Sequence, residues 1–227
     1  MKTATMNLQE VMAQLEVWGS PNARKLFAQQ GAGDNQLGVT LGKLRGLAKK
    51  LKTDHQLALK LWATVNVDAR ILATMLVTPA QLSAKEAERM IKPLTYFRLV
   101  DELVHNVLVK TSFADQLRTK WMDSPKEMIG RAGWKILCSR IVHGDTDRLD
   151  VDAILKKIGV EILSAPYRKQ EAMNCCLVEI GVHIPEFTRK CIDLGERLGR
   201  FDTRPVAKGC VSTYAPEWIA AVLKRKR

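Results

Sequence analysis

The segment LGKLRGLAKKL, residues 41–51, decides the fold class, because its apolar positions follow the period of an α-helix. Leucine recurs every three or four residues, at Leu41, Leu44, Leu47 and Leu51. This spacing puts the leucines on one helix face. A second stripe, on a different face, is basic and consists of Arg45, Lys49 and Lys52. One face is therefore expected to pack against the protein, and the other is available to phosphates.

The rest of the chain also shows the apolar spacing of α-helices. Further helices are expected at residues 7–17, 21–30, 54–64, 67–77, 83–92, 97–110, 112–122, 126–141, 149–163, 168–182, 185–199 and 216–225. Four of them follow start signals, namely Asp54, Ser83, Ser124-Pro125 and Ile184-Pro185. Asp and Ser cap helix N-termini, and Pro fits the first helical turn. No segment alternates apolar and polar residues for long enough to predict a strand, so the fold class is all-α.

Short motifs recur within these helices. Asp68-Ala-Arg70 resembles Ile129-Gly-Arg131 and Lys169-Gln-Glu171, with Val100-Asp101 as a degenerate copy, at spacings of 31, 30 and 40 residues. Periods in this range are typical of helix-pair solenoids, which present a long concave surface. Residues 1–227 are therefore expected to form one helical-repeat domain, in which Arg70, Asp101, Arg131 and Glu171 face the same groove. The alternative is an accidental likeness between helices.

Positive charge is concentrated in two segments. The chain carries 36 Lys and Arg against 24 Asp and Glu, a formal charge of +12. Residues 40–60 contribute +5 and residues 189–227 contribute +6. Segregated positive charge is the electrostatic footprint of a polyanion partner, which here favours nucleic acid. A solvated, solubilising surface is the alternative.

Metal, disulfide and membrane signals are missing from the sequence. The four histidines are scattered without an HExxH motif, and the five cysteines form no CxxC pair. We therefore expect no metal site, no cofactor and buried free thiols. The N-terminal residues lack the apolar core of a signal peptide, and the apolar runs are too short to span a membrane. These features predict a cytoplasmic protein, which would be nucleoid-associated when bound to DNA. The protein is also expected to be a monomer.

Asp101 stands out within the apolar stretch LTYFRLVDELVHNVLVK, residues 94–110. Phe97 lies four residues before it, so the two side chains share one helix face. A carboxylate near an apolar face costs free energy unless it is paired or used. Asp101 is therefore a candidate for a special role on an anionic partner, and a solvated Asp near a helix start is the alternative.

At this point the chain resembles the AlkD-like DNA alkylation repair family, HEAT-repeat proteins that include 3-methyladenine and 7-methylguanine DNA glycosylases. The resemblance lies in LALKLWATVNVDARILATML (57–76), YFRLVDELVHNVL (96–108), MIGRAGWKIL (128–137), EAMNCCLVEIGVHIPEFTRKCIDLGERLG (171–199) and GCVSTYAPEWI (209–219). It implies a right-handed α-solenoid that holds duplex DNA in a basic concave cleft, and a role in base excision repair.

The resemblance also implies site residues. Asp101 matches the catalytic Asp of the active glycosylases, and Arg131 best matches a family Arg on a later helix. Phe97 occupies the position of an aromatic residue that is usually Trp. A second active-site Trp would fall near Cys176 or Leu177, where this chain has no aromatic residue.

The implied reaction hydrolyses the N-glycosidic bond of a cationic N3- or N7-alkylated purine. Asp101 would stabilise the oxocarbenium-like sugar and orient water, as carboxylates do in glycoside hydrolysis. Arg131 would hold a backbone phosphate, and Phe97 would offer its ring to the sugar. The alternatives are a salt bridge from Arg131 to Asp101 or a neighbouring acid, and a core role for Phe97.

Sequence-nonspecific contacts to duplex DNA are expected from a cluster of basic residues. The candidates are Lys43, Arg45, Lys49, Lys52, Arg70, Arg200, Arg204 and Lys208. Two alternatives stand beside the glycosylase. One is a non-catalytic binder of damaged or branched DNA, and the other is a solenoid that binds an acidic protein partner.

Overall fold

The computed structural model describes residues 6–201 and 213–226. Within these residues the protein contains α-helices and short 3-10 turns and no β-strand, which confirms the all-α prediction. Packing groups the chain into two compact units, Met1–Ala114 and Asp115–Arg227. The expectation of one domain over residues 1–227 stays a prediction.

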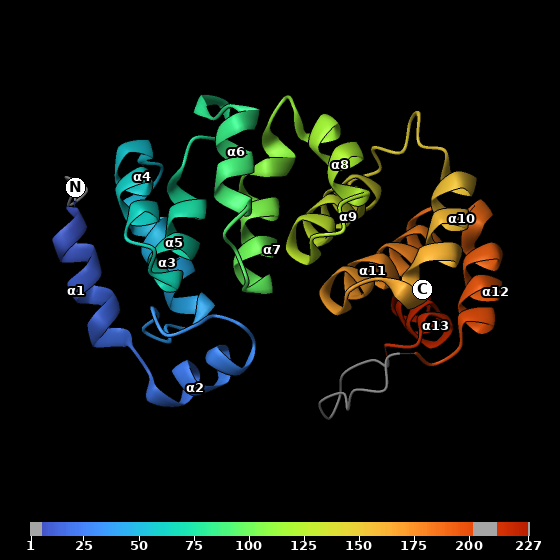
Figure 1. Cartoon of the computed structure of the whole chain (residues 1–227), viewed down its shortest axis with the longest axis horizontal. Coiled ribbons are helices and arrows are strands. Elements are labelled where there is room, and N and C mark those ends of the chain that lie inside the picture. Colours follow the sequence, from blue (N-terminus) through green and yellow to red (C-terminus); the bar gives the residue numbers. More distant parts are fainter. Residues whose placement is uncertain (1–5, 202–212, 227) are drawn as a thin grey trace. The chain divides into compact units, whose positions relative to one another are not determined.

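The first unit contains seven α-helices among its described residues (Figure 1). They are α1 (Leu8–Trp18), α2 (Pro21–Gln29), α3 (Leu41–Leu51), α4 (His55–Ala63), α5 (Val67–Leu76), α6 (Ala84–Ile91) and α7 (Phe97–Asn106), with 3-10 turns at Pro79–Gln81 and Leu108–Lys110. Helix α5 is central, because it packs against α3, α4 and α7. Most of its residues are buried, as a helix covered on several sides requires.

The second unit is built around α11 (Tyr167–His183). The other helices are α8 (Ala114–Met122), α9 (Glu127–Val142), α10 (Val151–Glu161), α12 (Thr188–Leu198) and α13 (Ala215–Lys226), with 3-10 turns at Ile162–Ser164 and Pro185–Phe187. Helix α11 packs against α9, α10, α12 and α13. Its core includes Trp134, the largest fully buried side chain.

The predicted helices are confirmed, and the differences lie at their ends. Residues 97–110 were expected as one helix, but α7 ends at Asn106 because Val107 leaves the helical region, with φ −123° and ψ −66°. The expected helix 185–199 begins with a 3-10 turn, and α12 starts only at Thr188. The helix expected at residues 126–141 begins one residue later, at Glu127, and ends one residue later, at Val142.

The predicted caps explain why helices begin where they do. The side chains of Asp54 and Ser83 accept hydrogen bonds from the backbone N–H groups of Leu57 and Glu86. These bonds satisfy donors that the first helical turn leaves without a partner. Local sequence therefore sets these two helix starts.

Candidate active site

A cavity of about 280 Å³ lies in the first unit, beside the start of α7. Its lining residues come from α2, α3, α5 and α7 and from the segments before α3 and α7. They are Phe27, Val39, Leu41, Leu44, Ile71, Tyr96, Phe97, Arg98, Asp101 and Glu102. The structure thus brings the predicted pair Phe97 and Asp101 into one cavity, because they lie one helical turn apart on α7.

Aromatic rings form one wall of the cavity. The ring centroids of Phe27 and Tyr96 lie 6.1 Å apart, and the rings of Tyr96 and Phe97 meet edge to face at 5.7 Å. Both distances fall in the range of favourable aromatic pairs. Phe97 is half-buried, so its ring both packs on the protein and faces the cavity. The wall can therefore receive a flat or cationic group.

The charged groups at the cavity balance, although the chain as a whole carries +12, because Arg45 pairs with one of the two lining carboxylates. Asp101 and Glu102 contribute two carboxylates, and Arg98 contributes one guanidinium. Glu102 accepts hydrogen bonds from Arg45 at 3.3 Å and from Asn106 at 2.9 Å. Asp101 is half-buried rather than fully solvated. Asp101 is therefore the carboxylate of this cavity that can face a cationic ligand.

A buried carboxylate holds the loop that leads to the cavity floor. Asp68 is almost fully buried and accepts hydrogen bonds from the backbone N–H groups of Leu37 at 2.6 Å, Gly38 at 3.2 Å and Val39 at 2.8 Å. Gly38 has φ +76°, and a Cβ there would lie 2.6 Å from the Ser20 carbonyl oxygen. The loop therefore requires glycine, and Asp68 fixes Val39 at the cavity.

Arg131, the second predicted catalytic residue, lies on α9 in the second unit and is buried. Its Nη1 lies 3.2 Å from Glu171 Oε2 and donates to the Arg168 carbonyl oxygen at 2.9 Å. Glu171 also accepts from Arg168 at 2.9 Å. The ion pair to a neighbouring acid, considered from the sequence as the alternative, is present. A role for Arg131 at a phosphate stays a prediction.

The four phosphate candidates on and just after α3 are exposed. Lys43 and Lys49 lie on the solvent side of α3, and Lys52 follows as its C-cap. Arg45 keeps 58% of its side chain exposed while it contacts Glu102. The leucines of the opposite face pack inward, with Leu44 and Leu47 buried. The two-faced reading of residues 41–51 is therefore confirmed, and contact with DNA stays a prediction.

Of the remaining phosphate candidates, Arg70 and Arg200 contact other protein groups, and the other two lie outside the described residues. Arg70 donates to the Trp62 carbonyl oxygen at 3.0 Å and lies over the Trp62 ring, and burial lowers its pKa. Arg200 pairs with Glu217 and lies 4.3 Å above the Tyr214 ring centroid. Arg204 and Lys208 lie outside the described residues.

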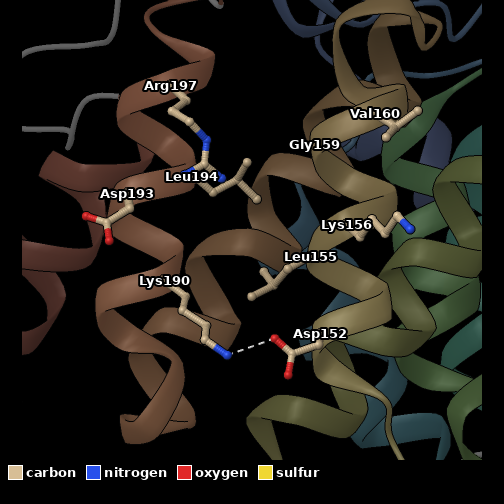
Figure 2. A pocket seen from close by; sticks show the side chains of 9 residues that line it. All are labelled: Asp152, Leu155, Lys156, Gly159, Val160, Lys190, Asp193, Leu194 and Arg197. Carbon is tan, nitrogen blue, oxygen red and sulfur yellow. Dashed lines mark hydrogen bonds and ion pairs between the residues drawn. The ribbon is translucent and has the colours of Figure 1, made fainter.

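A larger groove of about 500 Å³ lies between α10 and α12 of the second unit. Figure 2 shows Asp152 on α10 facing Lys190 on α12, with 2.9 Å between the carboxylate and the ammonium. Asp193 pairs with Arg189 at 2.8 Å. The lining mixes both signs of charge over an apolar floor and includes no residue predicted to be catalytic. The smaller cavity of the first unit is therefore the stronger candidate.

Neither a metal cluster nor a membrane helix appears in the part of the chain that the structure describes. No group of three or more His, Cys, Asp or Glu residues there could hold a metal ion. No helix there is long and apolar enough to cross a membrane.

Phe27 and Asp68 are two of the site residues that had not been singled out from the sequence. Phe27 lies in α2, a short helix without buried residues. A large apolar ring on such a helix is the one signal that could have indicated that this side chain lines a cavity. Asp68 had been assigned only to the repeat motif. Its partners are about thirty residues away in the chain, so no local pattern indicates them.

Comparisons with known proteins cover nearly the whole chain. Residues 11–219 match the sequence profile of the DNA alkylation repair enzyme family. Uncharacterised proteins of Listeria innocua serovar 6a and Listeria monocytogenes serovar 1/2a are 22% and 20% identical to this chain. In both comparisons the match covers 97% of this chain and 98% of the relative.

A solved structure has the same helical architecture. It is 26% identical to this chain, has a TM-score of 0.83, and is matched over 98% of this chain and 96% of its own. That protein represents a family related to the HEAT-like repeat DNA glycosylases and has affinity for branched DNA structures. The HEAT-like helix pairs expected from the sequence are thus confirmed, and the handedness and the basic cleft stay predictions.

Proposed function

The chain belongs to the DNA alkylation repair enzyme family, and on that premise we propose that it binds DNA and removes cationic alkylated purines as a glycosylase. The observation that carries the proposal is Asp101, a carboxylate in an aromatic cavity of a strongly basic protein. Positive charge elsewhere attracts DNA, and the Asp101 carboxylate favours a cationic lesion over a neutral base.

The chemistry follows from the substrate. Alkylation at N3 or N7 makes the purine cationic and weakens its N-glycosidic bond. As that bond breaks, its electrons leave with the base, which becomes neutral, and positive charge develops on the sugar. The Asp101 carboxylate stabilises that charge and orients a water molecule towards C1′. The water oxygen bonds to C1′ and the water loses a proton to the solvent, so that the products are the free base and an abasic sugar. The base needs no proton in order to leave.

The aromatic wall supports this step. Phe97 presents its ring beside Asp101, and Tyr96 holds that ring by the edge-to-face contact at 5.7 Å. A ring face attracts a cation, although phenylalanine does so less strongly than tryptophan. We expect Phe97 to position the sugar or base without taking part in bond breaking.

DNA would be held through its phosphates and without sequence preference by a monomer. The exposed cations Lys43, Lys49 and Lys52 belong to the same unit as the cavity. Arg45 lies between these lysines and the cavity, because its guanidinium contacts Glu102 of the cavity lining. Contacts to phosphates position a protein on DNA without reading its bases. The family resemblance adds Arg131 as a phosphate contact, which would require its guanidinium to exchange Glu171 for DNA.

The test is release of 7-methylguanine and 3-methyladenine from methylated duplex DNA by excess protein, beside a DNA-only control. Release above the uncatalysed rate supports the glycosylase, and no release refutes it for these lesions. A parallel titration of unmodified duplex tests DNA binding. Between 50 and 200 mM salt the affinity should fall by about 10³-fold or more if six or more phosphates are contacted.

A second candidate is a non-catalytic binder of branched DNA. It is favoured by the 26% identical relative with affinity for branched DNA, and by the missing aromatic residue near Cys176 and Leu177. Binding to a four-way junction and to a linear duplex of equal length separates the candidates. Strong preference for the junction together with no base release would favour this second function.

A further inference from the structure

The groove of the second unit lies between α10 and α12, two helices that both pack against α11. One face of each helix forms a wall of this α10–α12 groove. Asp152 and Lys156 of α10 lie four residues apart, as do Lys190 and Leu194 of α12, so each pair shares a helix face. A groove between two helix faces is a shape that a third helix can occupy.

Apolar side chains form the floor of the α10–α12 groove. Leu155 and Leu194 are almost fully buried, and Figure 2 shows both in the space between the two helices. Gly159 lets the helices meet closely, because a Cβ there would lie 3.2 Å from Leu194 Cδ1. Val160 also lines the groove, yet it is 73% exposed. An exposed valine beside an apolar floor offers surface that a partner can remove from water.

Charged side chains form the rim of the α10–α12 groove, and both of its carboxylates are already paired. Asp152 pairs with Lys190 across the groove, with 2.9 Å between the carboxylate and the ammonium (Figure 2). Asp193 pairs with Arg189, one turn earlier on α12, at 2.8 Å. Because each ion pair cancels one negative charge, the two carboxylates leave no net negative charge at the rim.

Two further cations of the lining, Lys156 and Arg197, are exposed. Each lies four residues after a lining carboxylate, Asp152 or Asp193, at the spacing that favours an ion pair within a helix. Both carboxylates pair with other side chains instead. Among the residues that the structure describes, neither Lys156 nor Arg197 has an ion pair of its own. The rim of the groove therefore carries an excess of two positive charges.

We propose that the α10–α12 groove binds an acidic amphipathic helix of a partner protein. The apolar face of that helix covers the floor and Val160, and its carboxylates pair with Lys156 and Arg197. Duplex DNA fits less well, because its phosphates gain nothing from an apolar floor. A second copy of this chain is disfavoured by its formal charge of +12. Binding of the helix does not require glycosylase activity.

The experiment titrates the full-length protein into a fluorescein-labelled helical peptide that has leucines on one face and glutamates beside them. Fluorescence anisotropy should show saturable binding of one peptide per protein, and hydrogen exchange should slow in residues 151–161 and 188–198. A peptide with lysines in place of the glutamates should not bind. No saturable binding of the acidic peptide up to about 1 mM would overturn the proposal. Protection of these two helices by duplex DNA but not by the peptide would overturn it as well.

Three variants, each checked for native helicity by circular dichroism, locate the binding. Lys156→Glu combined with Arg197→Glu should weaken peptide binding by about tenfold or more, because two attractions become repulsions. Val160→Ser should weaken it by about three- to tenfold, because less apolar surface is covered. The matched control is Lys224→Glu combined with Arg225→Glu, which changes the net charge equally at exposed cations of α13 outside the groove lining. It should bind as the wild type does, and equal weakening by both double variants would contradict the assignment to the groove.

Discussion

The charged side chains on α7 in the first unit and on α9 in the second unit differ in how they are satisfied. Asp101 on α7 is half-buried and lines a cavity. Arg131 on α9 is buried, and its guanidinium faces Glu171 and a backbone carbonyl. The repeat motif relates the two positions. However, Asp101 lies where it can contact a ligand, whereas Arg131 is enclosed by its protein partners. A shared position in a repeat therefore does not establish a shared role.

Within the first unit, Asp68 and Asp101 also differ: Asp68 is a buried carboxylate that holds a loop, and Asp101 is a half-buried carboxylate that lines the cavity. Replacing Asp68 by Asn leaves one oxygen for three backbone donors and should lower the free energy of unfolding by about 3 kcal/mol. Asp101→Asn should cost less than about 1 kcal/mol, because this side chain is only half-buried. Urea unfolding measures both changes. Equal losses would remove the contrast between a structural and a chemical carboxylate.

In the second unit, Arg131→Met tests whether the buried guanidinium is structural. The change leaves Glu171 and the Arg168 carbonyl with fewer partners, so the free energy of unfolding should fall by about 2–3 kcal/mol. Unfolding midpoints and DNA affinity are measured on the same samples. Unchanged stability with much weaker DNA binding would instead identify Arg131 as a phosphate contact.

Gly133 tests how tightly the second unit is packed. A Cβ at Gly133 on α9 would clash with the Met122 backbone nitrogen, so Gly133→Ala should cost about 1–3 kcal/mol. The control is Gly42→Ala on α3, where a Cβ meets nothing within 4 Å, and the higher helix propensity of alanine should stabilise the protein by about 0.5–1 kcal/mol. Thermal unfolding of the two variants should therefore shift in opposite directions, and a shift in the same direction would contradict the packing.

The smallest effect is expected at Asp115, an exposed carboxylate of α8. The hydrogen bond from Arg118 lowers its pKa, and burial opposes this only in part. The stabilisation is therefore complete above the ordinary pKa of Asp and disappears as pH falls through the lowered value. Asp115→Asn should cost less than about 1 kcal/mol at pH 7. Unfolding midpoints from pH 7 downward check this, and a difference that grows in acid would contradict it.

The sequence predicted most of the fold because helix signals are local. Leucine spacing identified α3, and the capping residues Asp54 and Ser83 located the starts of α4 and α6. The break at Val107 was not predicted, since the apolar pattern continues through it and the backbone changes there. Periodicity indicates which face is apolar, but it does not indicate where the backbone stops being helical.

The cavity was predictable only in part. Phe97 and Asp101 share one turn of α7, so their proximity follows from spacing alone. Phe27 reaches the same cavity from α2, and Asp68 holds its floor through partners about thirty residues away. Such contacts depend on how the helices pack, and no pattern within one segment contains that information.

The most direct test of the proposed active site compares release of 7-methylguanine from methylated duplex DNA by three proteins under single-turnover conditions. They are the wild type, Asp101→Asn and, as a matched control, Glu102→Gln, which changes the neighbouring carboxylate of the same cavity. We predict that Asp101→Asn lowers the rate by about 10²–10³-fold at unchanged DNA affinity, while Glu102→Gln stays within about tenfold of the wild type. Equal rates for the wild type and Asp101→Asn would contradict a catalytic role for Asp101.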